Sequence, residues 1–151
     1  MSGSANYEWK GVVMKTSHLL IFMGIFLLLT SCQYFRESGL NSDFDKATRE
    51  YFRMVRWHEL ERAPLTFIAD PLRDEFRRRL EAARNVQITD YRVRNMECRA
   101  GEGKGEVTVE WDYYIPPSFN LKTLEDPQRW EYVEEKNKKG WMLMTLFPEF
   151  K

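Results

Sequence analysis

The residue best suited to acid–base chemistry is His58, because an imidazole changes its charge close to neutral pH. It falls on the same apolar stripe as Tyr51, so both side chains are expected on the inward face of one helix. A histidine shifted by burial could act there as a catalytic general base. The alternative, which we favour, is a core histidine whose ring makes a structural hydrogen bond. The sequence assigns no aspartate partner to His58.

Aromatic side chains supply a second candidate site, a cavity for a ligand. They lie on the same helix and on later segments in which polar and apolar residues alternate. With the histidine, the candidates for lining a pocket are Tyr51, His58, Trp111, Tyr113, Trp130 and Trp141. Large aromatic residues dominate cores as well as binding sites, so these residues could equally be core.

Sites of other kinds find no support in the residue spacing. His58 and Cys98 are too far apart in sequence to match a metal-ligand motif, and we expect no metal and no cofactor. The stretch "GEGKG", residues 101–105, precedes a strand rather than the helix that a phosphate loop needs. The chain has 23 basic and 23 acidic side chains, a balance that does not point to nucleic acid as a partner.

Near the N-terminus, a short apolar run marks a targeting segment. It covers 11 residues, 19–29, whereas a membrane-spanning helix needs about 20. A short segment with Lys15 precedes it and small residues follow, as in a secretory signal peptide. Residues 1–13 add nothing to this signal, so we expect translation to start at Met14.

The end of the run, Leu29-Thr30-Ser31-Cys32, resembles the lipobox of bacterial lipoproteins. The resemblance implies that Cys32 becomes the lipidated N-terminus and holds the protein to a membrane. Gln33 follows where aspartate is associated with inner-membrane retention, which implies the outer membrane in a diderm host. The alternative is a plain signal peptide with Cys32 kept as a thiol. With Cys32 lipidated, Cys98 has no disulfide partner in the chain and is expected to act as a small hydrophobic residue.

These boundaries leave one folded domain. We expect a signal peptide over residues 1–31, a lipidated tether over 32–41, and a single domain over 42–151. Apolar spacing of three and four predicts helices over 42–59 and from Asp70 onward. The acidic residues before "RRR", residues 77–79, favour a salt-bridged helix surface over an anion-binding one.

After Asn85 the apolar period becomes two, which predicts strands. The expected strands are "VQITDYRVRNMECR", "VTVEWDYYI", "RWEYVEEK" and "WMLMTLF". In the first, the apolar positions change parity between Ile88 and Tyr91, which indicates a bulge or burial on both faces. The predicted fold class is α+β, with N-terminal helices on one face of a curved antiparallel sheet of about four strands.

Two segments, "RMVRWHELERAPLTFIADPLRDEF" and "QRWEYVEEKNKKGWML", make the chain similar to the nuclear transport factor 2-like superfamily. That resemblance implies a cystatin-like cone over most of residues 42–148. The superfamily includes isomerases, dehydratases and many non-catalytic binding domains, so it does not decide activity. We expect a lipid-anchored envelope protein that binds a ligand or partner without catalysis. The alternatives are a cone-type enzyme with His58 as base and a subunit of a larger envelope complex.

Overall fold

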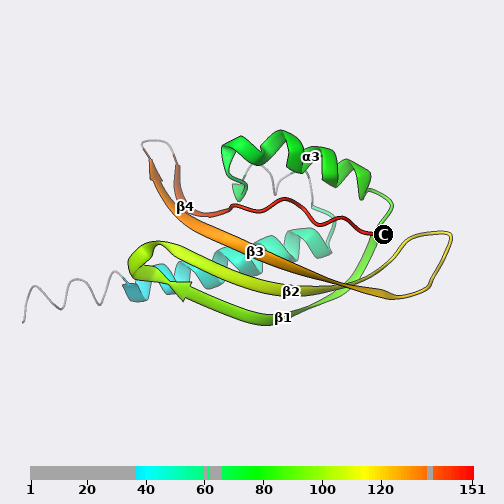
Figure 1. The fold of residues 1–151 in the computed structure, drawn as a ribbon, viewed down its shortest axis with the longest axis horizontal. Coiled ribbons are helices and arrows are strands. Elements are labelled where there is room, and N and C mark those ends of the chain that lie inside the picture. The colour runs from blue at the N-terminus through cyan, green and yellow to red at the C-terminus, as the bar shows by residue number, and fades with distance from the viewer. Residues whose placement is uncertain (1–36, 60, 62–65, 136–137) are drawn as a thin grey trace, which may run out of the picture. The chain divides into compact units, whose positions relative to one another are not determined.

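The computed structural model describes residues 37–59, 61, 66–135 and 138–151. A helix covers residues 37–56, here the first helix, and a 3₁₀ turn, η1, covers Asp70–Leu72. Helix α3, Arg73–Ala82, leads into strand β1, Gln87–Arg99. A second turn, η2 (Ala100–Glu102), precedes β2, Lys104–Tyr114, and the chain ends with β3, Lys122–Glu135, and β4, Lys138–Leu143. Figure 1 shows this order from cyan to red.

The first helix is amphipathic, as its sequence predicts, but it starts before the predicted residue 42. Residues 37–41, expected to belong to the tether, are helical. Leu40 is buried there, and its carbonyl accepts a hydrogen bond of 3.1 Å from the indole Nε1 of Trp141. Apolar residues then recur every three or four positions through Phe44 and Tyr51 to Val55, which buries one stripe of the helix.

Helix α3 also follows its predicted pattern. Phe76 and Leu80 are buried, and Phe76 packs edge-on against Phe147 of the C-terminal segment, with ring centroids 5.5 Å apart. On the charged side of the helix, Glu75 forms ion pairs with Arg78 and Arg79. The "RRR" run therefore forms the salt-bridged surface that was predicted.

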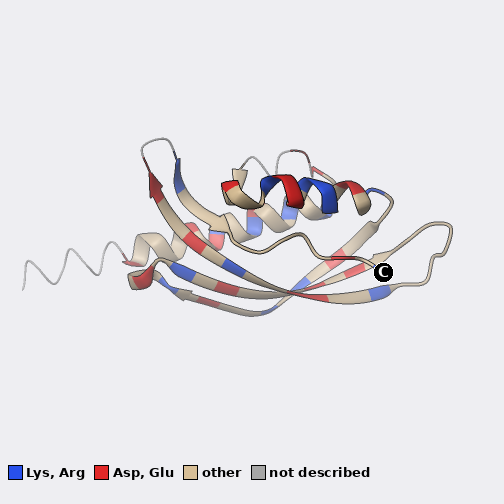
Figure 2. Ribbon diagram, turned by 45° about the horizontal axis from the view of Figure 1, so that its top comes forward, with Lys and Arg blue, Asp and Glu red and all other residues tan. Residues whose placement is uncertain are grey.

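The four strands form an antiparallel meander in the order β1-β2-β3-β4. The odd positions of β2 face the first helix, and its pairing with β3 brings the even positions of β3 to the same inner face. Gly105 allows the first helix to pack closely on β2, because a Cβ atom there would lie 2.5 Å from the ring of Phe44. The strands bend along their length, and both charge signs are spread along them (Figure 2). The predicted α+β class with a four-stranded antiparallel sheet is confirmed.

Several strand boundaries differ from the prediction, and two differ most. β3 begins at Lys122 rather than Arg129, and the last strand ends at Leu143 rather than Phe147. Pro127 explains the first difference, because proline cannot donate to a ladder and lowers strand propensity. It is tolerated because β4 pairs with β3 only from Trp130 onward, which leaves Pro127 outside that ladder.

The change of parity in β1 is a bulge. Pairing with β2 shifts by one residue between Ile88 and Asp90 and again between Val93 and Asn95. After each shift the inner face of β1 continues on positions of the other parity. β1 forms one edge of the sheet, and its only strand partner in the described part of the chain is β2.

Candidate functional site

A buried polar network lies on the inner face of the sheet. Asp126 and Gln128 take inward positions of β3, beside Trp111 of β2. The Oδ2 of Asp126 accepts a hydrogen bond of 2.7 Å from the Gln128 amide and one of 3.2 Å from the Trp111 indole. The Trp130 indole donates in turn to the Gln128 carbonyl at 3.2 Å. Four buried side chains from two strands are thus joined by hydrogen bonds.

Burial dominates the electrostatics of this network. The Asp126 side chain is only 5 % exposed, and burial raises the pKa of its carboxyl group, although the bonds from Gln128 and Trp111 oppose the rise. The pKa of Tyr51, on the first helix, is also raised, first by burial and then by the charge of Asp126. The Tyr51 hydroxyl has no hydrogen-bond partner within the described residues.

A carboxyl group of raised pKa near a tyrosine has the composition of an acid–base site. Its surroundings are filled, however. Tyr51 packs on Trp130 with ring centroids 5.6 Å apart, and Phe52 packs on Trp111 at 5.7 Å. All four rings are fully buried, so the network is part of the core rather than the wall of an open pocket in the described region. Such a network fixes one arrangement of strands and helix.

Sequence reasoning missed Asp126 and Gln128. The signal was present, because Asp126, Gln128 and Trp130 alternate with outward residues in the period of a strand. Pro127 and the polar composition of residues 122–128 concealed it. The structure brings Tyr51, Trp111 and Trp130 together around these two residues, as the pocket-lining prediction grouped them, but in a packed core.

His58 lies elsewhere, and the expectation that it faces inward on the first helix is wrong. The helix ends at residue 56, and His58 takes a left-handed backbone conformation with φ of 56°. Its amide donates to the Val55 carbonyl, and the next amide, of Glu59, donates to the Met54 carbonyl. These two bonds form a Schellman motif, in which the left-handed residue ends the helix.

The His58 ring is exposed to solvent and makes one structural contact. Its Nε2 lies 2.8 Å from the carbonyl oxygen of Val86. Since a carbonyl only accepts, Nε2 carries the proton in this bond. The contact ties the end of the first helix to the residue before β1, which is a positioning role.

The two remaining aromatic candidates occupy other parts of the core. The Tyr113 hydroxyl donates to the backbone oxygen of Lys151 at 2.8 Å, and its ring contacts Phe150. The Trp141 ring contacts Phe44 with centroids 4.8 Å apart. Among the described residues, neither of them forms a hydrogen bond with the Asp126 network, and both anchor terminal parts of the fold.

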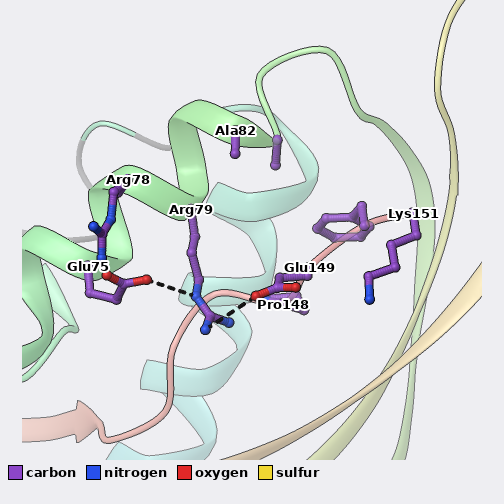
Figure 3. Close-up of a pocket in the computed structure, with 9 residues that line it drawn as sticks. Glu75, Arg78, Arg79, Ala82, Pro148, Glu149 and Lys151 are labelled. Carbon is purple, nitrogen blue, oxygen red and sulfur yellow. Dashed lines mark hydrogen bonds and ion pairs between the residues drawn. The ribbon is translucent and has the colours of Figure 1, made fainter.

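A groove of about 320 Å³ lies between α3 and the C-terminal segment (Figure 3). Arg79 crosses it, paired with Glu75 at 3.3 Å and with Glu149 at 3.4 Å, and it donates to the Phe147 carbonyl. These three charged side chains of the groove are therefore paired with one another. A second cavity of about 330 Å³ borders Trp141 and Lys139, and Lys139 is paired with Glu134. Apart from Lys151, whose ammonium has no ion pair among the described residues, the charged side chains that line these two cavities are paired.

The outer face of the sheet carries a denser charge cluster. Arg92 of β1 forms ion pairs with Asp112 and Glu110 of β2, and Arg94 pairs with Glu110 at 2.7 Å. Asp112 also accepts a 2.7 Å bond from the Thr123 hydroxyl. The bond from Arg92, then that from Thr123, holds the pKa of Asp112 below its usual range. These ion pairs connect β1 to β2. Among the described residues, no group of acidic, histidine and cysteine side chains could hold a metal ion.

On the inner face of β1, the first helix reaches Tyr91, whose ring lies 5.3 Å from that of Phe52, but it leaves the stretch around Val93 and Met96 partly uncovered. Val93 and Met96 belong to this face, because they pair with the buried Val109 and Val107 of β2. They are nevertheless 45 % and 36 % exposed. Cys98, on the same face, is a free thiol whose pKa is raised by burial, so it is not an activated nucleophile.

The chain matches no known protein-family model, and no significant match is found among curated proteins or solved structures. The site must therefore be interpreted from its own geometry.

Proposed function

We propose that this chain is a lipid-anchored envelope protein whose domain binds a partner along the edge strand β1, without catalysing a reaction. The observation that carries the proposal is the exposure of Val93 and Met96 on the inner face of a 13-residue edge strand. An edge strand offers unpaired backbone donors and acceptors to an added strand, and neighbouring apolar side chains add specificity.

The anchor belongs to the proposal through the sequence alone. The lipobox-like Leu29 to Cys32 lies outside the described residues. Cys32 carries the lipid in this account, and Gln33 favours the outer membrane, on its periplasmic face, in a diderm host. The described part of the chain contains no helix long and apolar enough to span a bilayer.

We also propose that the domain is a variant of the nuclear transport factor 2-like cone. The packing of the first helix on the inner face of a bent antiparallel meander supports this assignment. In enzymes of that superfamily the interior holds the substrate. Here Trp111, Trp130 and Tyr51 occupy the centre of the inner face, and His58 lies outside it. Both features favour the binding module over the isomerase or dehydratase alternative.

Photocrosslinking in the native membrane tests the function. A photoreactive residue in place of Val93 is expected to give an adduct of discrete mass. The adduct should disappear when Met96→Lys is added, because an inward charge on an edge strand disfavours strand addition. Leu121, 63 % exposed in the β2–β3 connection, is the matched position for a control and should give no adduct. A folded, anchored protein without an adduct at position 93 would contradict the proposal.

A further inference from the structure

We infer that the partner of β1 is a second copy of this chain, joined by antiparallel pairing of the two β1 strands in one register. This inference rests on the proposed function and names its partner. In that register Val93 lies opposite the partner's Met96, and the two-fold axis passes between Arg94 and Asn95. The two four-stranded sheets would join into one continuous sheet.

The second bulge of β1, between Val93 and Asn95, restricts the registers that are possible. Before the bulge, the inner face holds Tyr91 and Val93, and after it Met96 and Cys98, because the pairing shifts between Val93 and Asn95. Two copies of the stretch from Asp90 to Arg99, which contains this bulge alone, align their inner faces on both sides of it only if the axis passes through the bulge itself. The chosen register does so, and sets Val93 against Met96 and Tyr91 against Cys98.

The outer-face charges select the same register. Arg92 then lies opposite the partner's Glu97, and Asp90, which pairs with Arg56 at 3.3 Å in its own chain, lies opposite the partner's Arg99, so each copy contributes two pairs of opposite charges. Moving the axis by one residue sets Asp90 against Glu97 in one direction and Arg92 against Arg99 in the other. Like charges directly opposite one another destabilise a sheet. Charge and face alignment, two independent properties of β1, thus agree.

Glu97 supplies a further indication. Its neighbour on β2 is another acid, Glu106, which is already bonded by Arg99 at 2.6 Å. No ion pair to Glu97 is found within the described ranges, and no hydrogen bond to its side chain. Across the proposed edge it meets Arg92, whose guanidinium has five N–H donors, of which the bonds to Asp112 and Glu110 use four. The partner's Arg92 therefore offers what the acid lacks within its own chain.

A register-specific disulfide tests the inference on the full-length, anchored protein. Residues directly opposite in an antiparallel pair have Cα atoms about 4.5 to 5.5 Å apart, within the range of about 4.4 to 6.8 Å that a disulfide needs. Positions 93 and 96 of one strand are about 10 Å apart and cannot be joined. In a Cys98→Ser background, Val93→Cys combined with Met96→Cys should therefore give a covalent dimer on mild oxidation.

The controls separate the register from general proximity. Val93→Cys alone and Met96→Cys alone should give little dimer, because each position is three residues from its own copy in the proposed pairing. Phe119→Cys combined with Leu121→Cys, two exposed positions outside β1, should give none. Absence of dimer from the Val93/Met96 pair, or equal dimer from the single variants, would overturn the inference. If photocrosslinking at Val93 then captures another protein, the proposed function stands and only the identity of the partner fails.

A charge variant gives a second, non-covalent measurement. Glu97→Arg removes the like-charge contact with Glu106, so the stability of the isolated subunit should not fall. In the dimer, the substitution places an arginine opposite the partner's Arg92 at two symmetric positions. Because these like charges repel, the dimer dissociation constant, measured by light scattering in detergent, should rise about tenfold. Unchanged dimer affinity together with unchanged subunit stability would count against the register.

Discussion

The indole Nε1 of Trp111 donates a hydrogen bond of 3.2 Å to the Oδ2 of Asp126, and this bond joins β2 to β3 inside the hydrophobic core. A carboxyl group in such a place can accept hydrogen bonds but resists ionisation, because the carboxylate ion would be poorly solvated there. The network therefore orders the core while making its stability depend on pH.

The first prediction concerns that dependence. Burial raises the pKa of Asp126 in the folded state, so its contribution to stability is complete below the ordinary carboxyl pKa of about 4 and is lost as pH rises through the folded pKa. Asp126→Asn cannot ionise and still offers an accepting oxygen to Trp111 and Gln128. Urea unfolding at several pH values should show that the variant lacks this loss at higher pH.

Asp112→Asn is the matched control, with the opposite sign. Arg92 and Thr123 lower the pKa of Asp112, so its contribution is present at neutral pH and is lost as pH falls through its folded pKa. Asp112→Asn should destabilise the protein at neutral pH. If both variants responded alike, the assigned environments of the two carboxyl groups would be incorrect.

The second prediction concerns the core. Trp111→Ala removes a fully buried ring and one hydrogen bond to Asp126, and should lower the free energy of unfolding by about 3 to 5 kcal/mol. Trp57→Ala removes the same type of side chain from a site that is 67 % exposed. It should change the free energy of unfolding by about 0.5 kcal/mol or less. Equal melting of the two variants would show that the strand register is wrong.

Much of this core could be predicted from the sequence, and its exceptions have physical causes. The odd positions of β2 carry a clear period of two, so the burial of Trp111 followed directly. His58 was misplaced because the apolar stripe continues past the point where the helix ends. The ending depends on backbone conformation, and the chain has histidine where a glycine would have marked it. Asp126 was missed because a buried carboxyl group is visible only when its donors on two strands are known.

The third prediction concerns the two structural features of His58, its left-handed backbone conformation and its hydrogen bond to Val86. His58→Gly fits the left-handed conformation and loses only the bond to Val86, so its stability should remain within about 1 kcal/mol of the wild type. His58→Val, which is β-branched, should cost about 1 to 2 kcal/mol more. Unfolding measurements compare the two.

His58→Gln tests the enzyme alternative, because glutamine forms hydrogen bonds but does not exchange a proton near neutral pH. A folded, anchored His58→Gln protein should complement any phenotype of the gene. Failure to complement, at unchanged protein level, would favour the enzyme.

The fourth prediction concerns the anchor. Cys32→Ala should abolish incorporation of labelled fatty acid and leave an unprocessed precursor, because each buried methylene adds about 0.8 kcal/mol and two or more chains anchor a protein stably. Cys98→Ala, the other cysteine of the chain, should incorporate label normally. Label in the Cys32→Ala protein would rule out lipidation at this residue.

The most direct test of β1 as a partner-binding strand is amide hydrogen exchange of the full-length protein in membrane vesicles. If β1 had no partner on its outer edge, every second residue would point its N–H away from the sheet. About half of the β1 amides should in that case exchange quickly. We predict instead that the β1 amides from Tyr91 to Cys98 exchange as slowly as those of β2, which is paired on both sides. Val93→Lys should release the outward β1 amides, and Leu121→Lys should not. Rapid exchange of alternate β1 amides in the wild-type protein would contradict the account.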